Sequence, residues 1–188
     1  MKKVLKNGST SYFQINGSKF YGFGFYIEDE NEVNSIVKKL WEEHKKAVHI
    51  CYGLVCNQNN LLIERFDDDN EPKNLAGKKI LLALQNNNFV NSLVVVVRYK
   101  TKSLLGSGLL SRSYYKVSEL LLQESENYSE YTNTYKFEID IKDQKELSNL
   151  LNLSKSNRLT ILEQSESKAT IRVEELNLEF VKQKLNLC

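Results

Sequence analysis

Basic side chains that could bind phosphate are concentrated in one segment of this 188-residue sequence. Residues 72–118 hold eight lysines and arginines and no aspartate or glutamate, although charged residues make up 27% of the chain. Folding either gathers these bases on one positive face, suited to phosphate or to an acidic protein surface, or disperses them over several faces. The sequence alone leaves both alternatives open. The residues of this segment that we predict to contact an anion or a nucleic acid are Lys78, Lys79, Arg98, Tyr99, Lys100, Lys102 and Arg112.

A short glycine-containing turn follows these basic residues. Gly106, Ser107 and Gly108 come at the start of a predicted helix. Free N–H groups at a helix N-terminus attract anions, so these three residues join the predicted anion site. The spacing fits neither a Walker motif nor a dinucleotide fingerprint. A Gly-x-Gly sequence also serves tight turns and close packing, and that interpretation stays open.

An acidic run, Asp67-Asp68-Asp69-Asn70-Glu71, precedes Pro72. Its oxygen ligands could hold Mg²⁺ or Ca²⁺, but the run lacks the spaced pattern of an EF-hand loop. Most such runs are solvated loops. The interpretation we favour is that Asp68, Asp69 and Glu71 shape a loop facing the basic segment, where they pair with Arg98 or Arg112.

A histidine and a cysteine share one face of a predicted strand. His49 and Cys51 alternate, whereas Cys56 lies an odd number of residues away and faces the other side. Such a pair could be a nucleophile with its base, or half of a metal site. The sequence holds no second Cys–His cluster, and buried cysteine commonly acts as a small hydrophobe. We therefore predict no catalytic residue, no metal ligand and no cofactor.

The elements that must position these residues follow from hydrophobic periodicity. Asn16-Gly17-Ser18 predicts a hairpin turn, because asparagine and glycine tolerate positive φ. Gly22 and Gly24 share one face of the following strand, where a neighbouring element is expected to pack closely. The strands are predicted at residues 11–15, 19–27, 47–56, 61–66 and 93–99, and the helices at 28–44, 76–86 and 105–123.

A change of composition after residue 124 predicts a second domain. Residues 1–124 form the first domain, 125–132 a polar linker, and 133–188 a small domain with the order β-α-β-β-α. That order fits a ferredoxin-like fold without its last strand, which a second subunit could supply at the exposed sheet edge. The elements are expected at residues 134–141, 143–152, 158–164, 169–174 and 176–186.

Composition indicates a cytoplasmic protein. No run approaches the ~18 apolar residues of a membrane span, and no apolar region follows the basic residues at the start of the chain. Three cysteines, an odd number, do not form a disulfide framework.

Taken together, several segments resemble the YigZ/Impact family. Asp68-Asp69-Asn70-Glu71-Pro72, followed by Ala76-Gly77, is similar to the family motif D-D-G-E-P-x-G-T-A-G. The segments 94–99, 105–109 and 112–114 are similar to V-V-R-Y-F-G-G-x-x-L-G-x-G-G-L-x-R-A-Y. The resemblance covers about residues 18–123, and the order of the segments is more specific than any one of them.

The resemblance implies a two-domain α+β protein. Its N-terminal domain would be similar to domain IV of elongation factor G, and its ferredoxin-like C-terminal domain to domain V. Family members are associated with translation control. We therefore expect a non-enzymatic regulator of translation that binds RNA or the ribosome through the basic segment, with a protein partner in translation control also open.

The sequence departs from the family pattern at several loop positions. Asn70 and Leu109 replace glycines, Leu75 replaces threonine, and Lys79 replaces proline. Lys100-Thr101-Lys102 stands where the family has Phe-Gly-Gly. Loss of glycine narrows the backbone conformations that a loop can adopt. We therefore expect these loops to bind an anion less well through main-chain N–H groups and to rely instead on the charge of the added lysines.

Two alternatives from other classes stay open. One is an enzyme that acts on a small anionic substrate, with a metal at the Asp68–Glu71 loop opposite Arg98. The other is a module that binds an acidic protein and contacts no nucleic acid. No membrane association is predicted.

Overall fold

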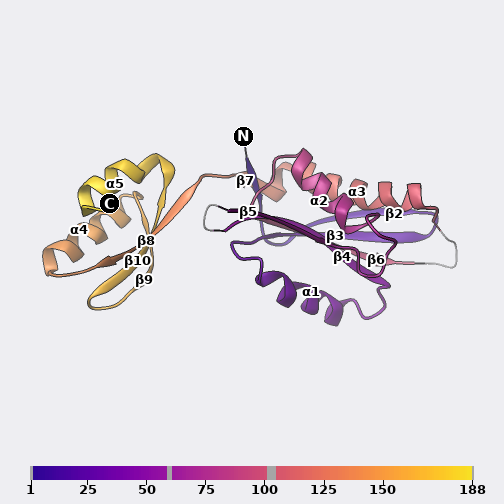
Figure 1. The fold of residues 1–188 in the computed structure, drawn as a ribbon, viewed down its shortest axis with the longest axis horizontal. Coiled ribbons are helices and arrows are strands. Elements are labelled where there is room, and N and C mark those ends of the chain that lie inside the picture. The colour runs from indigo at the N-terminus through magenta and orange to yellow at the C-terminus, as the bar shows by residue number, and fades with distance from the viewer. Residues whose placement is uncertain (1, 59–60, 101–104, 188) are drawn as a thin grey trace. The chain divides into compact units, whose positions relative to one another are not determined.

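The computed structural model describes residues 2–58, 61–100 and 105–187 of the chain. It divides into two units, Met1–Tyr131 and Thr132–Cys188, each with its own sheet and helices (Figure 1). Lys102, one of the predicted phosphate contacts, lies outside the described residues, as does Thr101. The predicted α+β class is confirmed.

A five-stranded antiparallel sheet forms the centre of the N-terminal unit. Its strand order is β2-β3-β6-β4-β5. The hairpin between β2 and β3 turns at Asn16 and Gly17, which have φ values of 47° and 76°. This turn confirms the prediction made from the Asn-Gly pair. The strands are β2 (Ser9–Ile15), β3 (Ser18–Tyr26), β4 (His49–Gln58), β5 (Leu61–Asp67) and β6 (Ser92–Tyr99).

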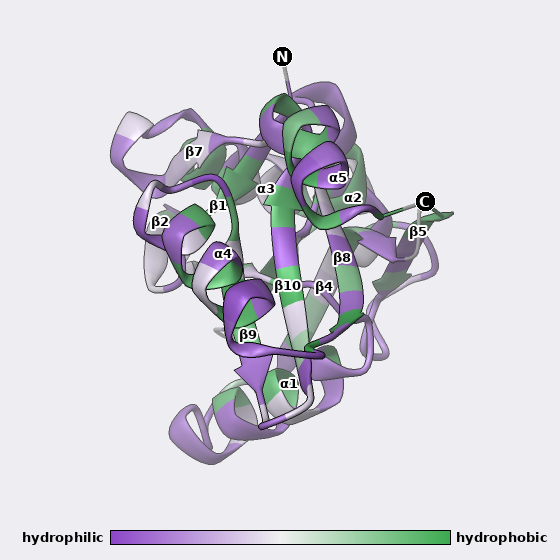
Figure 2. Cartoon of the chain, turned by 90° about the vertical axis from the view of Figure 1, so that its left-hand side faces the viewer, coloured by the Kyte–Doolittle hydropathy of each residue, from purple (hydrophilic) through white to green (hydrophobic). Residues whose placement is uncertain are grey.

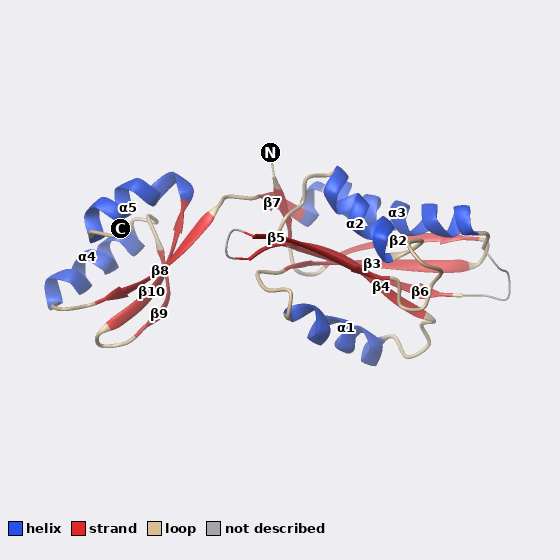
Figure 3. Ribbon diagram, in the orientation of Figure 1, coloured by secondary structure: helices blue, strands red, loops and turns tan. Residues whose placement is uncertain are grey.

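Helices cover both faces of this sheet (Figure 3). On one face lie α2 (Gly77–Asn86) and α3 (Ser107–Gln123), and on the other lies α1 (Glu32–Glu43). Each face has its own apolar core, and alternate residues of the central strand β6 belong to one or the other. Because β6 is covered twice, its sequence is a continuous run of valines without polar alternation.

Two glycines of β3 allow α3 to approach the sheet. A Cβ at Gly22 would lie 3.4 Å from Leu121 Cδ1, and a Cβ at Gly24 would lie 3.1 Å from Leu121 Cδ2. The expectation of close packing over this face of the strand is confirmed.

A small two-stranded sheet joins the start of the chain to the end of the N-terminal unit. β1 (Lys3–Leu5) pairs antiparallel with β7 (Tyr128–Glu130), directly after the short 3₁₀ helix η1 (Ser125–Asn127). Most of the predicted polar linker, residues 125–132, therefore belongs to the N-terminal unit, which ends at Tyr131. Strands of three residues whose partners are more than 120 residues apart carry no local periodic signal.

The C-terminal unit is a three-stranded antiparallel sheet of order β8-β10-β9, with two helices. Its core includes Leu150, Ile171 and Val181. Figure 2 shows the alternation of apolar and polar residues along β10, which directs one face of the strand to this core. The elements are β8 (Thr134–Asp140), α4 (Gln144–Lys155), β9 (Thr160–Gln164), β10 (Lys168–Glu174), η2 (Glu175–Asn177) and α5 (Leu178–Leu185). This confirms the predicted β-α-β-β-α order; within the described residues, β8 is an edge strand.

Candidate functional site

Asp68 holds the start of α2 in place. Its carboxylate accepts hydrogen bonds from the backbone N–H groups of Asn74 at 2.7 Å, Ala76 at 3.1 Å and Gly77 at 2.8 Å. These donors lie at the N-terminus of the helix, where N–H groups lack partners within the helix. Ala76 at the N-cap position has no capping side chain. Asp68 therefore caps α2 from the preceding loop.

Asp69 ties the same loop to β4. Its Oδ2 accepts a hydrogen bond from the Ile50 N–H at 2.7 Å, and its own N–H donates to Asp67 Oδ1 at 2.6 Å. Its carbonyl oxygen lies 2.7 Å from His49 Nδ1. Desolvation by burial raises the pKa of the Asp69 carboxyl above its ordinary value, and the charges of Asp67 and Glu71 add to that rise.

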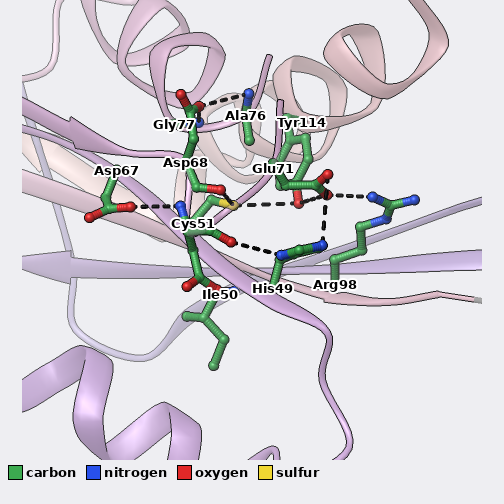
Figure 4. A network of polar contacts seen from close by, with 11 residues as sticks. His49, Ile50, Cys51, Asp67, Asp68, Glu71, Ala76, Gly77, Arg98 and Tyr114 are labelled. Atoms are coloured by element: carbon green, nitrogen blue, oxygen red, sulfur yellow. Dashed lines mark hydrogen bonds and ion pairs between the residues drawn. The ribbon is translucent and has the colours of Figure 1, made fainter. Parts of the chain in front are cut away.

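Glu71 is the buried centre of the network (Figure 4). Its carboxylate accepts hydrogen bonds from the Arg98 guanidinium and, at 2.8 Å, from the Tyr114 hydroxyl. His49 Nε2 lies 3.8 Å from its other oxygen. The side chains of Glu71 and Arg98 are each only 4% exposed. The expectation that the acidic loop pairs with a base of the basic segment is met at Arg98, whereas Arg112 lies elsewhere.

Left-handed residues shape the acidic loop. Asp69, Asn70 and Asn74 have φ values of 42°, 61° and 65°. Asn70 stands where the family motif has glycine, and Asn74 stands at its next glycine. Asparagine and aspartate tolerate the left-handed region better than other residues with a Cβ. Asn70 therefore adopts a left-handed conformation that glycine also favours, despite the expected loss of conformational freedom at position 70.

Gly77, at the last glycine of the motif, allows a close backbone approach. A Cβ there would lie 2.3 Å from the carbonyl oxygen and 2.6 Å from the carbonyl carbon of Asp67. No substituent fits in that space. The start of α2 can therefore lie directly against the end of β5, which brings its N–H groups within reach of Asp68.

The two described cysteines are structural. Cys51 Sγ donates a hydrogen bond to the Asp68 carbonyl oxygen at 3.1 Å and lies 3.5 Å from the Tyr114 hydroxyl. Burial raises the pKa of the Cys51 thiol far above its ordinary value. Cys56 belongs to the core on the opposite face, and burial raises its pKa to about 11. Neither is a thiolate at neutral pH, so the geometry gives no support to a cysteine nucleophile.

Arg98 does not reach the surface. Its buried guanidinium is used within the network of Glu71, so the prediction that it contacts phosphate directly is not supported by its position. In the sequence, Arg98 lies two residues before the exposed Lys100. Alternation along β6 turns Arg98 toward α2 and α3, and it turns Tyr99 toward the face that α1 covers.

Two of the predicted contacts line one groove. Lys79 from α2 and Arg112 from α3 border a groove of about 540 Å³, together with Lys116. Its floor includes Phe13, Leu82 and Tyr115. Tyr114, the neighbour of Tyr115, is fully buried. Lys116 was not among the predicted contacts, although it belongs to the same acid-free segment. The apolar residues of the groove come from elements far apart in the sequence, so local patterns could not identify them.

The other predicted contacts among the described residues do not line this groove. Tyr99 and Lys100 line a separate hollow with Lys19 and His44. Lys78 and Pro72 are exposed, as are Gly106, Ser107 and Gly108 at the start of α3. A Cβ at Gly106 or Gly108 would meet no described atom within 4 Å, so close packing does not explain these two glycines. The bases of residues 72–118 are thus dispersed over more than one surface.

The geometry of the acidic loop does not favour a metal. Both oxygens of Asp68 already accept backbone hydrogen bonds, and Glu71 is occupied by Arg98 and Tyr114. Within residues 2–58, 61–100 and 105–187, no three histidine, cysteine, aspartate or glutamate side chains are placed to hold a metal ion. Among the described helices, none is both long and apolar enough to cross a membrane.

Comparison with known proteins finds a matching family model and several relatives. Residues 16–122 match the Impact N-terminal domain. An IMPACT family member from Haemophilus influenzae is 35% identical over 102 residues, which are 54% of this chain and 50% of that protein. IMPACT family member YvyE from Bacillus subtilis is 31% identical over 117 residues, 62% of this chain and 54% of that protein. These matches span about half the length of the relatives.

The whole chain also resembles a solved structure. A crystal structure of a hypothetical protein superposes with a TM-score of 0.68 at 20% sequence identity. The likeness covers 100% of this chain and 95% of the other. It shows that the two proteins share a fold.

Proposed function

The chain belongs to the family of the Impact N-terminal domain, and on that premise we propose that it regulates translation by binding RNA or the ribosome. The observation that carries the proposal is the groove between α2 and α3. Lys79 and Arg112 border it, and no carboxylate is among the described residues that line it. A concave surface with one sign of charge attracts an anion more strongly than separated surface charges do.

The buried network connects the two helices that border this groove. Asp68 fixes the start of α2, and Tyr114 of α3 donates a hydrogen bond to Glu71. The two helices that carry Lys79 and Arg112 are therefore joined through one loop. Arg98 contributes by holding Glu71, as a positioning residue rather than as a contact. Lys78 and the exposed turn Gly106–Gly108 remain proposed contacts for phosphate.

Co-sedimentation with ribosomes and separated subunits, at low and moderate salt, tests the proposal. We expect salt-sensitive binding that weakens in a Lys79→Ala/Arg112→Ala variant. Each phosphate contact removed lowers the slope of log K against log salt by about one unit. The matched control is Lys38→Ala/Lys39→Ala on α1, which removes the same charge from the other face of the sheet. Equal binding by the folded groove variant and the wild type would overturn the assignment.

The apolar floor of the groove favours a second candidate, a module that binds an acidic protein. Leu82 lines this groove and is 38% exposed. An aliphatic side chain offers RNA neither a charge for its phosphates nor a ring for its bases, whereas it can pack against apolar side chains of a protein. Treatment of the bound fraction with nuclease separates the two candidates. Release of the protein on RNA digestion supports RNA or ribosome binding, whereas nuclease-resistant binding that still depends on Lys79 and Arg112 supports a protein partner.

A further inference from the structure

The sheet face opposite the groove carries a second basic hollow. Its volume is about 540 Å³, and its lining residues are Gly17, Lys19, Tyr21, His44, Tyr99 and Lys100. Two of the six are lysines, and none of the described lining residues is a carboxylate. The hollow lies where β3 begins and β6 ends, because Lys19 pairs with Tyr99 in the register of these strands.

Aromatic rings form a row across three neighbouring strands at this place. Tyr12 of β2 and Tyr21 of β3 have ring centroids 4.9 Å apart, and Tyr21 and Tyr99 of β6 have centroids 5.7 Å apart at an angle of 83°. His44 Nδ1 lies 2.7 Å from the Tyr99 hydroxyl, which fixes the imidazole against the end of the row. The row is therefore ordered before any ligand arrives.

The rings are only partly used by the core. Tyr21 and Tyr99 border the apolar core beneath α1, yet both remain partly exposed, and Tyr12 is 46% exposed. α1 ends at Glu43, directly before His44. A sheet face with tyrosine rings left open beyond the end of its covering helix offers flat π surfaces to a ligand.

Exposed lysines lie at the hollow that this aromatic row borders and directly after His44. Lys19 and Lys100 are exposed at the hollow, and Lys45 and Lys46 are exposed directly after His44. Long lysine side chains beside a stacking surface can reach the phosphates next to a stacked base. Aromatic rings on a sheet with basic flanks are the combination that binds single-stranded nucleic acid.

We propose that this hollow binds an unpaired base of a single-stranded RNA, stacked on the Tyr99 ring with the Tyr21 ring at its edge, while Lys19 and Lys100 contact the flanking phosphates. The choice of RNA rests on the proposed function. The surface is distinct from the groove of Lys79 and Arg112, since those residues line a separate groove formed by α2 and α3. In this proposal, the groove of Lys79 and Arg112 binds phosphates, and the hollow of Tyr21 and Tyr99 binds unpaired bases.

Fluorescence anisotropy with a labelled oligouridylate of about ten nucleotides tests this proposal. The comparison probes are an abasic oligonucleotide of equal length and charge, an RNA hairpin without unpaired ends, and single-stranded DNA of the corresponding sequence. Loss of one stacked base weakens binding by roughly 5- to 100-fold, so the abasic probe should bind more weakly by about that factor. Tyr99→Leu should weaken oligouridylate binding similarly, whereas Tyr99→Phe keeps the ring and should stay within about twofold.

Tyr135→Leu, on β8 of the C-terminal unit and outside both proposed surfaces, is the matched control and should leave oligouridylate binding unchanged. Thermal unfolding checks that each variant is folded, and the abasic probe tests the wild-type protein even if Tyr99→Leu does not fold. Equal binding of the abasic and base-containing RNA would overturn the proposal, as would preference for the hairpin or for DNA.

The two proposals fail separately. Loss of ribosome binding in Lys79→Ala/Arg112→Ala, with oligouridylate binding unchanged, supports both surfaces as assigned. Absence of ribosome binding in the wild type would overturn the proposed function, but a base-dependent oligouridylate signal would still support the stacking site. Absence of oligouridylate binding alone would overturn only the stacking site.

Discussion

Arg98 and Glu71 form a buried ion pair between the middle of the sheet and the loop before α2. Tyr114 of α3 donates a hydrogen bond to the same carboxylate, so one side chain joins a strand, a loop and a helix. The low dielectric of this site strengthens the pair but makes either charge costly without its partner.

Glu71→Gln should therefore destabilise the N-terminal unit strongly. Removing one partner of a buried ion pair costs about 3–5 kcal/mol, because the remaining guanidinium stays buried without a counter-charge. Urea unfolding followed by circular dichroism measures this loss. The exposed Glu64→Gln is the control and should change stability by less than about 0.5 kcal/mol. A cost below about 1 kcal/mol for Glu71→Gln would show that the pair is not essential.

Asp68→Asn should weaken the start of α2. Two oxygens of Asp68 accept three backbone hydrogen bonds, and an amide NH₂ in place of one oxygen leaves at least one N–H without an acceptor. The expected cost is about 1–3 kcal/mol in the free energy of unfolding. Asp143→Asn on α4 is a matched control, because Asp143 accepts a single hydrogen bond from Glu146 N–H and asparagine caps helices equally well. Equal effects of the two substitutions would contradict the capping role of Asp68.

Gly77→Ala and Gly108→Ala should have opposite effects on stability. Alanine at 77 would press a methyl group into the Asp67 backbone, which cannot move without displacing β5. We expect a loss at the upper end of the roughly 1–3 kcal/mol typical of overpacking. Alanine at 108 meets no described atom within 4 Å and raises helix propensity, for a gain of up to about 1 kcal/mol. Thermal unfolding measures the stability of both variants. A Gly77→Ala protein as stable as the wild type would show that residue 77 does not lie so close to the Asp67 backbone.

Asp69→Asn should gain stability relative to the wild type as pH rises. Burial raises the Asp69 pKa in the folded state, so its contribution is complete below the unfolded value of about 3.8 and is lost as pH increases through the folded value. Asparagine keeps an acceptor for the Ile50 N–H without the buried charge. Urea unfolding of both proteins at about pH 3.5 and about pH 6.5 measures the difference in stability. A difference that is independent of pH would show that Asp69 has the same pKa in both states.

Local patterns predicted most elements of the fold, because the long strands and helices each bury a periodic apolar face. They did not predict β1 and β7, which depend on pairing between the two ends of the N-terminal unit. For the candidate site, the sequence predicted that Asp68, Asp69 and Glu71 pair with Arg98 or Arg112, and of these pairs the structure shows that of Glu71 with Arg98. The sequence could not show that Arg98 is buried, because that depends on which face of β6 receives α2 and α3.

The distribution of bases is a similar case. Residues adjacent in sequence, such as Arg98 and Tyr99, point to opposite faces of one strand. Lys79 and Arg112 are far apart in sequence but border one groove, because α2 and α3 pack against each other on the same face. A segment without carboxylates therefore predicts positively charged surface, but it does not predict over how many separate surfaces the basic side chains are distributed.

The left-handed turns also affect the unfolded chain. Among the described residues, eight residues other than glycine have positive φ, and seven of these eight are asparagine. An asparagine restricts the disordered backbone more than a glycine would, so the entropy lost on folding is smaller at each of these positions. At positive φ the Cβ also costs energy in the folded state, which offsets this gain, and asparagine keeps that cost lower than most other residues with a Cβ do. Replacement of glycine by asparagine at these turns therefore acts on the folded and the unfolded state in opposite directions.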